Sequence, residues 1–112
     1  MDRNSYVSFL LSFYGPLLTE RQYTALDCHY NNDLSLGEIA QQQNSSRQAV
    51  SDAINKGISA LEAYEEKLGC VKKYREMNKI ITGLKELSCM CGAETSSRIN
   101  EELERIADIW EE

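Results

Sequence analysis

The sequence has little of what β-sheets and irregular folds need: one proline, six glycines, and no stretch in which apolar and polar residues alternate for more than a few positions. Residue types that favour helices, such as Ala, Leu, Glu, Lys and Gln, are common instead. We therefore predict an all-α fold. A chain of 112 residues forms one modest core and leaves no room for a second, catalytic domain.

Long hydrophobic runs and a signal-peptide pattern are also missing. No apolar stretch approaches the roughly 20 residues that a membrane span needs, and the first residues lack the pattern of a secretory signal. The sequence predicts a cytoplasmic protein without a membrane span.

Side chains for catalysis and metal binding are few and poorly spaced. His29 has no serine or cysteine partner at a spacing typical of a catalytic pair, and no glycine-rich phosphate loop is present. Structural zinc needs two pairs of ligands at short spacing. The four cysteines supply one C-x-C pair and two isolated thiols, at Cys28, Cys70, Cys89 and Cys91. We expect no enzymatic activity, no cofactor, no metal, and reduced thiols in a reducing compartment.

Positive charge is scarce as well, which bears on nucleic-acid binding. The formal net charge is −6, and from Met1 to Cys70 five basic side chains stand against nine acidic ones. Domains that bind nucleic acid are usually basic, because neutralising phosphates supplies most of their non-specific affinity. The charge balance therefore weighs against DNA as a partner.

The stretch from Leu34 to Leu68 nevertheless has the layout of a helix-turn-helix. Ser35 and Glu38 have the spacing of a capping box at the start of the first helix. Asn44 suits the left-handed backbone conformation of a turn. This segment therefore predicts a short helix, a tight turn at Asn44, and a second helix that continues well past the motif.

The second helix of this layout begins at Ser45 or Ser46, and Ser45 with Gln48 would form another capping box. Its inner side carries Val50, Ile54 and Ile58. In helix-turn-helix proteins the second helix normally reads the major groove of DNA.

Two helices are predicted before the motif. The first starts at Asn4 or Ser5 and stops at Gly15 and Pro16. Its apolar face, at a helical spacing that indicates core packing, consists of Tyr6, Phe9, Leu10 and Phe13. A capping box at residues 19–22 begins the second helix. This helix turns Tyr23, Leu26 and Tyr30 inward.

The segment from Leu18 to Ile54 resembles region 4 of sigma-70-type factors. The runs FYGPLLTERQ, DLSLGEIA, SRQAVSDAI and LEAYEEKL, in this order, resemble the YlxM family of small bacterial proteins over about the first two thirds of the chain. The resemblance implies a sigma-70 region 4-like helix-turn-helix bundle with a C-terminal helical extension, and a homodimer. YlxM-like proteins are described as regulators linked to the signal recognition particle pathway, because their genes neighbour those of the particle protein and its receptor.

The chain departs from these families at three positions. Gln43 and Ser45 stand where helix-turn-helix proteins commonly place apolar residues to anchor the turn, and Ser51 stands where YlxM-like sequences usually carry tyrosine. These differences weigh against groove reading and against a rigid turn.

We predict a helix-turn-helix domain at residues 1–68 and a helical extension at residues 69–112 that serves as a dimerisation element. The helix after the turn has a heptad-like apolar seam that runs past the motif and should pack on the C-terminal helices or on a second subunit. A basic helix at residues 71–88 and an acidic last helix from Ser96 or Ser97 follow, and they either pair with each other or remain two solvated faces. The expected dimer interface comprises Leu61, Tyr64, Leu68, Leu103, Ile106 and Trp110.

The candidate nucleic-acid-binding residues are the polar positions facing outward at the start of the second motif helix: Ser46, Arg47, Gln48, Ser51, Asn55 and Lys56. Arg and Gln pair bidentately with guanine and adenine edges, whereas Ser, Asn and Lys suit phosphates. Asp52 would repel phosphate unless it pairs with Lys56 one turn later. Polar residues also cover any solvated helix face, and Arg47 could instead cap the helix or pair with an acidic neighbour.

Two functions remain open. The motif favours a DNA-binding regulatory protein, dimerised through its C-terminal helices, that takes part in the signal recognition particle pathway by resemblance. The charge favours a protein-interaction module that contacts the protein or RNA of that particle without binding DNA.

Overall fold

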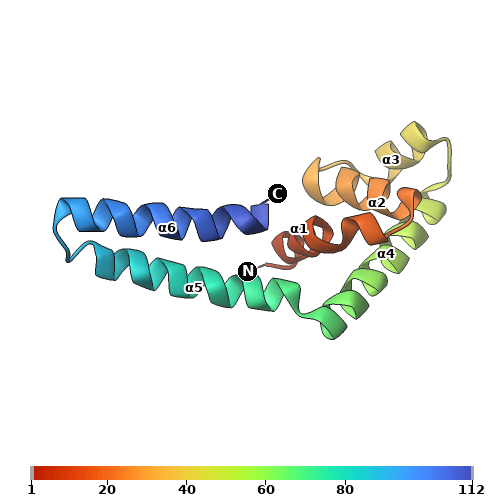
Figure 1. Cartoon of the computed structure of the whole chain (residues 1–112). Coiled ribbons are helices and arrows are strands. Elements are labelled where there is room, and N and C mark those ends of the chain that lie inside the picture. The colour runs from red at the N-terminus through yellow and green to blue at the C-terminus, as the bar shows by residue number, and fades with distance from the viewer. Residues whose placement is uncertain (1, 112) are drawn as a thin grey trace. The chain divides into compact units, whose positions relative to one another are not determined.

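The computed structural model describes residues 2–111, all of whose regular elements are helical, so the predicted all-α fold is confirmed (Figure 1). The chain divides into two compact units, Met1–Val71 and Lys72–Glu112. The elements are α1 (Arg3–Tyr14), η1 (Gly15–Leu17), α2 (Glu20–Leu26), η2 (Asp27–Asn31), α3 (Leu36–Gln43), α4 (Arg47–Leu68), α5 (Cys70–Ser88) and α6 (Ala93–Glu111). Within the described residues, none of these helices is both long enough and apolar enough to cross a membrane.

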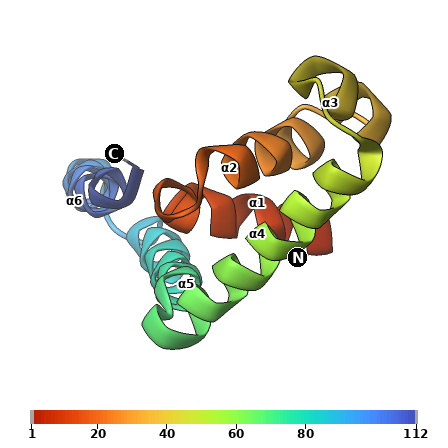
Figure 2. The ribbon, with the colours of Figure 1, turned by 90° about the vertical axis from the view of Figure 1, so that its right-hand side faces the viewer.

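In the first unit, α1, α2 and α3 all contact α4 (Figures 1 and 2). The largest fully buried side chains of this unit come from all of these helices and from the residue that ends the unit: Leu10, Leu26, Ile39, Val50, Leu61 and Val71. Helices α2 and α4 approach closely at Gly57, where a β-carbon would lie 2.7 Å from Cδ1 of Leu26. Gly57 therefore lets the two helices cross at this distance.

Helix α1 begins earlier than predicted, at Arg3, because Asp2 caps it. The backbone N–H of Ser5 donates to Oδ1 of Asp2 over 2.7 Å. The buried face of the helix is also rotated from the expected one and consists of Val7, Leu10, Leu11 and Tyr14. The predicted aromatic residues Tyr6, Phe9 and Phe13 are only partly buried and pack around this face.

The predicted stop at Gly15 and Pro16 is confirmed, but its reason is different. Gly15 has φ −51°, which is not a left-handed conformation, and it begins the short 3-10 helix η1. A β-carbon here would lie 2.7 Å from Cε2 of Tyr23. The ring of Tyr23 thus lies on Gly15 and is 41% exposed, so the inward position predicted for Tyr23 is wrong.

Helix α2 begins with the predicted capping box of Thr19 and Gln22, in which each side chain accepts a hydrogen bond from the other's backbone N–H. Leu26 is buried, as predicted. The chain then continues as one π-helical turn, η2, in which Tyr30 is half-buried.

The helix-turn-helix is formed by α3, the turn and α4. Ser35 and Glu38 make the predicted capping box, and Asn44 adopts the predicted left-handed conformation with φ 57°. Ser46 caps α4 by accepting a hydrogen bond from the N–H of Ala49 over 3.0 Å. The alternative box of Ser45 and Gln48 does not form, since Ser45 lies before the cap and its N–H donates to the carbonyl of Ala40.

Most of the apolar seam of α4 packs within its own unit, in a core that also takes in Val71 at the start of α5. Helix α1 contacts α4, and the rings of Tyr14 and Tyr64 lie 6.0 Å apart. Leu61 is fully buried in this core, whereas Leu68 in the last turn is 51% exposed.

In the second unit, α5 and α6 run antiparallel as a helical hairpin (Figure 1). Helix α6 begins at Ala93, earlier than the predicted Ser96 or Ser97. Few side chains are buried between the helices, namely Ile81, Ser88 and Leu103. Lys85 pairs with Glu104 over 2.9 Å, so the basic and acidic helices do pair within the chain.

A polar network joins the end of α4 to the start of α5 inside the first unit. The hydroxyl of buried Tyr14 donates to Oε1 of Glu65 over 2.6 Å and accepts from the N–H of Cys70 over 3.0 Å. The N–H of Val71 donates to the same Glu65 oxygen over 3.0 Å. Two N–H groups at the helix start, which have no partner within the helix, are satisfied in this way. Burial, and then the bond to Glu65, raise the pKa of Tyr14 above its ordinary value of 10.0.

Replacing Tyr14 by Phe removes this network's central hydroxyl. We expect the free energy of unfolding to fall by about 1–3 kcal/mol, because buried polar partners lose their hydrogen bonds. The raised pKa means that the hydroxyl's contribution is complete below pH ~10 and is lost as the pH rises above that value. The stability difference between wild type and Tyr14→Phe should therefore shrink above pH ~10 in urea titrations. Tyr23→Phe, at an exposed ring, is the control, and an equal loss there would contradict the assignment.

Candidate nucleic-acid interface

The first half of α4 presents most of the predicted binding residues to solvent. Arg47, Gln48, Asn55 and Lys56 are exposed, and Ser51 is half-buried. The hydroxyl oxygen of Ser46 accepts the capping bond from Ala49, so its first role is structural, although its hydrogen is free to donate.

Arg47 lies at the edge of α4 that faces α3. A β-carbon built on Gly37 of α3 would lie 3.9 Å from both Cδ and Nε of Arg47. The ion pairs among residues 2–111 are Arg3–Glu62, Lys85–Glu104 and Arg105–Glu102. The alternative in which Arg47 pairs with an acidic neighbour is therefore not seen, and its guanidinium is exposed beside α3.

The pairing with Lys56 that would offset the charge of Asp52 does not form among the described residues. Oδ1 of Asp52 instead accepts a hydrogen bond from Nε2 of Gln48, one turn earlier, over 3.1 Å. A neutral amide leaves the negative charge uncompensated. Asp52 therefore places an unneutralised carboxylate in the middle of the predicted reading surface.

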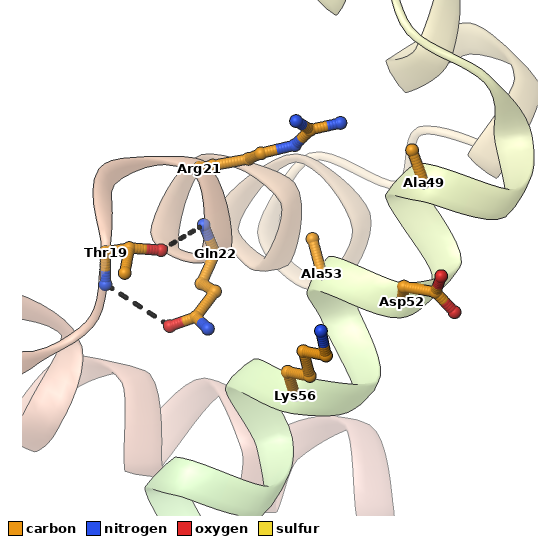
Figure 3. Close-up of a pocket in the computed structure, with 7 residues that line it drawn as sticks. All are labelled: Thr19, Arg21, Gln22, Ala49, Asp52, Ala53 and Lys56. Carbon is orange, nitrogen blue, oxygen red and sulfur yellow. Dashed lines mark hydrogen bonds between the residues drawn. The ribbon is translucent and has the colours of Figure 1, made fainter.

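Arg21 of α2 lies opposite the edge of α4 that faces α2, and it is not among the residues predicted from the sequence. A hollow of about 300 Å³ between the two helices is lined by Thr19, Arg21, Gln22, Ala49, Asp52, Ala53 and Lys56 (Figure 3). Arg21 also lines a second hollow of about 530 Å³, with Glu20, Thr24 and residues 43–45 of the turn. The sequence signal was present in the run TERQ, which indicated only a helix cap.

Charge is unevenly distributed along α4. Its first twelve residues carry Arg47, Asp52 and Lys56, whereas its last turns carry Glu62, Glu65, Glu66 and Lys67. The acidity of this helix is thus concentrated at the end opposite the turn. The negative net charge of the first unit is therefore a weaker argument against DNA binding at the predicted interface than the count of charged residues suggested.

The predicted dimer residues differ in their exposure. Leu61 and Leu103 are buried inside their own units, Tyr64 is half-buried, and Leu68, Ile106 and Trp110 are exposed. The second unit instead exposes a set of large apolar side chains, which we call the hairpin face: Ile80, Leu84, Leu87, Ile106 and Ile109. At 3.6 residues per turn in two antiparallel helices, these positions lie on the same side of the hairpin.

The cysteines do not gather into a ligand set in the part of the chain that is described. Cys28 and Cys70 are half-buried, Cys89 and Cys91 are exposed, and all four are free thiols. Across residues 2–111, no three His, Cys, Asp or Glu side chains are placed to hold a metal ion.

Comparison with known proteins gives a family match and close relatives. The family UPF0122, described as "Putative helix-turn-helix protein, YlxM / p13 like", matches residues 1–104. A UPF0122 protein of Acetivibrio thermocellus is 42% identical over 113 residues, covering 100% of this chain and 97% of the relative. A UPF0122 protein of Caldanaerobacter subterraneus is 48% identical over 72% of this chain and 69% of the relative. One from Bacillus cereus is 35% identical over 99% and 96%.

Any DNA that approaches this surface would meet the carboxylate of Asp52. We expect Asp52→Asn to tighten DNA binding by about fivefold at low salt, because one charge repelling phosphates across water is removed. Fluorescence anisotropy with random-sequence duplexes measures the change. Glu66→Gln, at the acidic end of the same helix, is the matched control, and an equal gain there would show that only net charge matters.

Proposed function

The chain belongs to the UPF0122 family of YlxM / p13-like helix-turn-helix proteins, and on this premise we propose that it is a regulatory protein that binds double-stranded DNA with the first half of α4. The observation that carries the proposal is the exposed, unpaired guanidinium of Arg47 in the first turn of the second motif helix. Helix-turn-helix proteins contact base edges with the N-terminal residues of this helix.

The residue types at this helix end suit the two kinds of DNA contact. Arg47 can donate both arms of its guanidinium to O6 and N7 of guanine, and Gln48 can pair with adenine. Ser46, Ser51, Asn55 and Lys56 suit phosphates and base edges further along the groove. The left-handed Asn44 and the cap at Ser46 fix the angle at which α4 leaves the turn, so a short polar turn still positions the helix.

The negative net charge limits the expected affinity for DNA, but it does not prevent the N-terminal half of α4 from contacting the groove. The acidic side chains of α4 lie in its last turns, beyond the predicted contact region. Few phosphate contacts are available, so binding should be modest and the slope of log K against log salt should be small, since it scales with the number of phosphates contacted.

A protein-interaction module is the second candidate function, and the acidic last turns of α4 are the observation that favours it. Glu62 and Glu66 are exposed there. They could meet a basic surface on a component of the signal recognition particle, the pathway to which YlxM-like proteins are linked. In this case capture of the partner from lysate should persist after nuclease treatment, whereas DNA-mediated capture should not.

We also propose that the protein is a homodimer joined through the hairpin face. Ile80 is 65% exposed and Ile109 is 74% exposed, and monomers rarely leave a continuous apolar stripe of this kind uncovered. Helix α5 is basic and α6 acidic outside this stripe, so α5 of one copy can lie against α6 of the other with favourable charge.

Arg47→Ala should weaken binding to a selected DNA sequence by about 1–3 kcal/mol, since the bidentate contact to one base pair is lost. Fluorescence anisotropy at low salt, with DNA selected from a random pool, is the measurement. Arg47→Lys keeps the charge without the planar fork and should recover affinity for random DNA but not the preference for the selected sequence. Equal binding by wild type and Arg47→Ala would remove the groove-reading role.

Leu84→Glu and Ile109→Glu should each convert the dimer to a monomer, because a charge would be buried in the apolar interface. Light scattering should change from about twice the chain mass to 12.8 kDa at micromolar concentration. Thr82→Glu adds the same charge on another side of α5, where the residue is exposed, and should leave the mass unchanged. A wild-type mass of 12.8 kDa would overturn the dimer.

A further inference from the structure

We propose that Arg21 of α2 and Lys56 of α4 form a phosphate-binding cleft, which holds a backbone phosphodiester of the bound DNA at the edge of the reading helix. This inference rests on the proposed DNA binding and adds to it a second contact point on a different helix. Arg21 lies outside the helix-turn-helix itself.

The cleft exists because small side chains line one edge of α4. Ala49 and Ala53 leave a hollow of about 300 Å³ opposite Thr19, Arg21 and Gln22. Figure 3 shows the Arg21 side chain reaching from α2 toward α4, with Lys56 on α4 below it. The hollow is open to solvent, so a phosphate can enter without displacing the core.

The two cations of the cleft are exposed and unpaired. Neither Arg21 nor Lys56 takes part in the ion pairs formed among residues 2–111. The polar neighbours Thr19 and Gln22 are occupied with each other in the capping box. Two carboxylates lie at or near the cleft. Asp52 is one of the residues that line it and accepts a hydrogen bond from Gln48, and Glu20 lines the second hollow. In Figure 3 the Asp52 carboxylate points away from Arg21.

The position of the cleft on α4 matches the geometry of a helix in the major groove. At 3.6 residues per turn, Gln48 and Asn55 form the outward strip of the helix, and Lys56 lies toward the α2 edge. Arg47 lies at the opposite edge, beside Gly37 of α3. A helix that presents its outward strip to the bases of the ~12 Å wide groove has a phosphate backbone along each edge. A contact at the α2 edge would fix the register of α4 without reading sequence.

The test is an anisotropy titration of wild type and Arg21→Ala over a series of salt concentrations, with selected and random DNA. Arg21→Ala should weaken binding to both DNAs alike, by about five- to tenfold at low salt, and should lower the slope of log K against log salt by ~1. Arg21→Lys should recover most of the slope. Arg3→Ala removes a cation that is paired with Glu62 and lies outside the cleft, so its slope should equal that of wild type. Melting temperatures confirm that each variant folds.

The double variant Arg21→Ala/Lys56→Ala tests whether both residues hold the same phosphate. Its loss of affinity should be smaller than the product of the two single losses, because either single change already breaks the shared contact. The cleft is overturned if wild type binds DNA while Arg21→Ala keeps the wild-type affinity and slope. A loss confined to the selected sequence would also overturn it, since Arg21 would then read bases. If wild type binds no DNA at any salt, the proposed function itself fails, which is a different result.

Discussion

The packing of α4 against the helices that precede it is the contact on which the rest of the first unit depends. Gly57 lets α2 approach so closely that any side chain there would collide with Leu26, and α1 covers the later turns through Tyr14 and Tyr64. With one side of α4 buried, its first turns are held rigidly while their opposite side stays exposed. The helix-turn-helix can therefore present Arg47 in a fixed direction.

The same helix separates two kinds of charge. Its N-terminal half combines Arg47 and Lys56 with a single carboxylate, and its C-terminal half is acidic. Coulomb interactions between exposed groups are screened within about 8–10 Å at physiological salt, so a ligand at the turn is governed by nearby side chains more than by the net charge of −6. DNA contact at one end and protein contact at the other are thus compatible on one helix.

The second unit leaves much of its apolar surface exposed. Two antiparallel helices can bury only the seam between them, here Ile81, Ser88 and Leu103, and the hairpin face remains in water. Each exposed aliphatic side chain gains roughly 1.5–3 kcal/mol when it is fully buried. A second hairpin that covers this face would supply the apolar contacts that this unit lacks alone.

Features that depend on neighbours a few residues apart could be predicted from the amino-acid sequence. The capping boxes at Thr19 and Ser35 and the left-handed turn at Asn44 involve contacts within one helical turn, so residue type and spacing suffice. The exposed side of α4 was also predictable, because helical period places Gln48 and Asn55 together.

Which helix faces pack against each other could not be predicted from the sequence and is seen in the fold. The ring of Tyr23 lies on Gly15, the seam of α4 packs on α1, and Leu61 and Leu103 are used up inside the chain. Arg21 comes beside Lys56 across 35 positions of sequence. An apolar stripe in the sequence indicates that another apolar surface covers it, and an unpaired cation indicates that an anion lies near it. Several segments of the chain have the residue types to fill either role, so the sequence alone does not identify which one does. The segments that pack together are those whose surfaces fit: the lack of a β-carbon at Gly57, for example, sets how closely α2 and α4 approach.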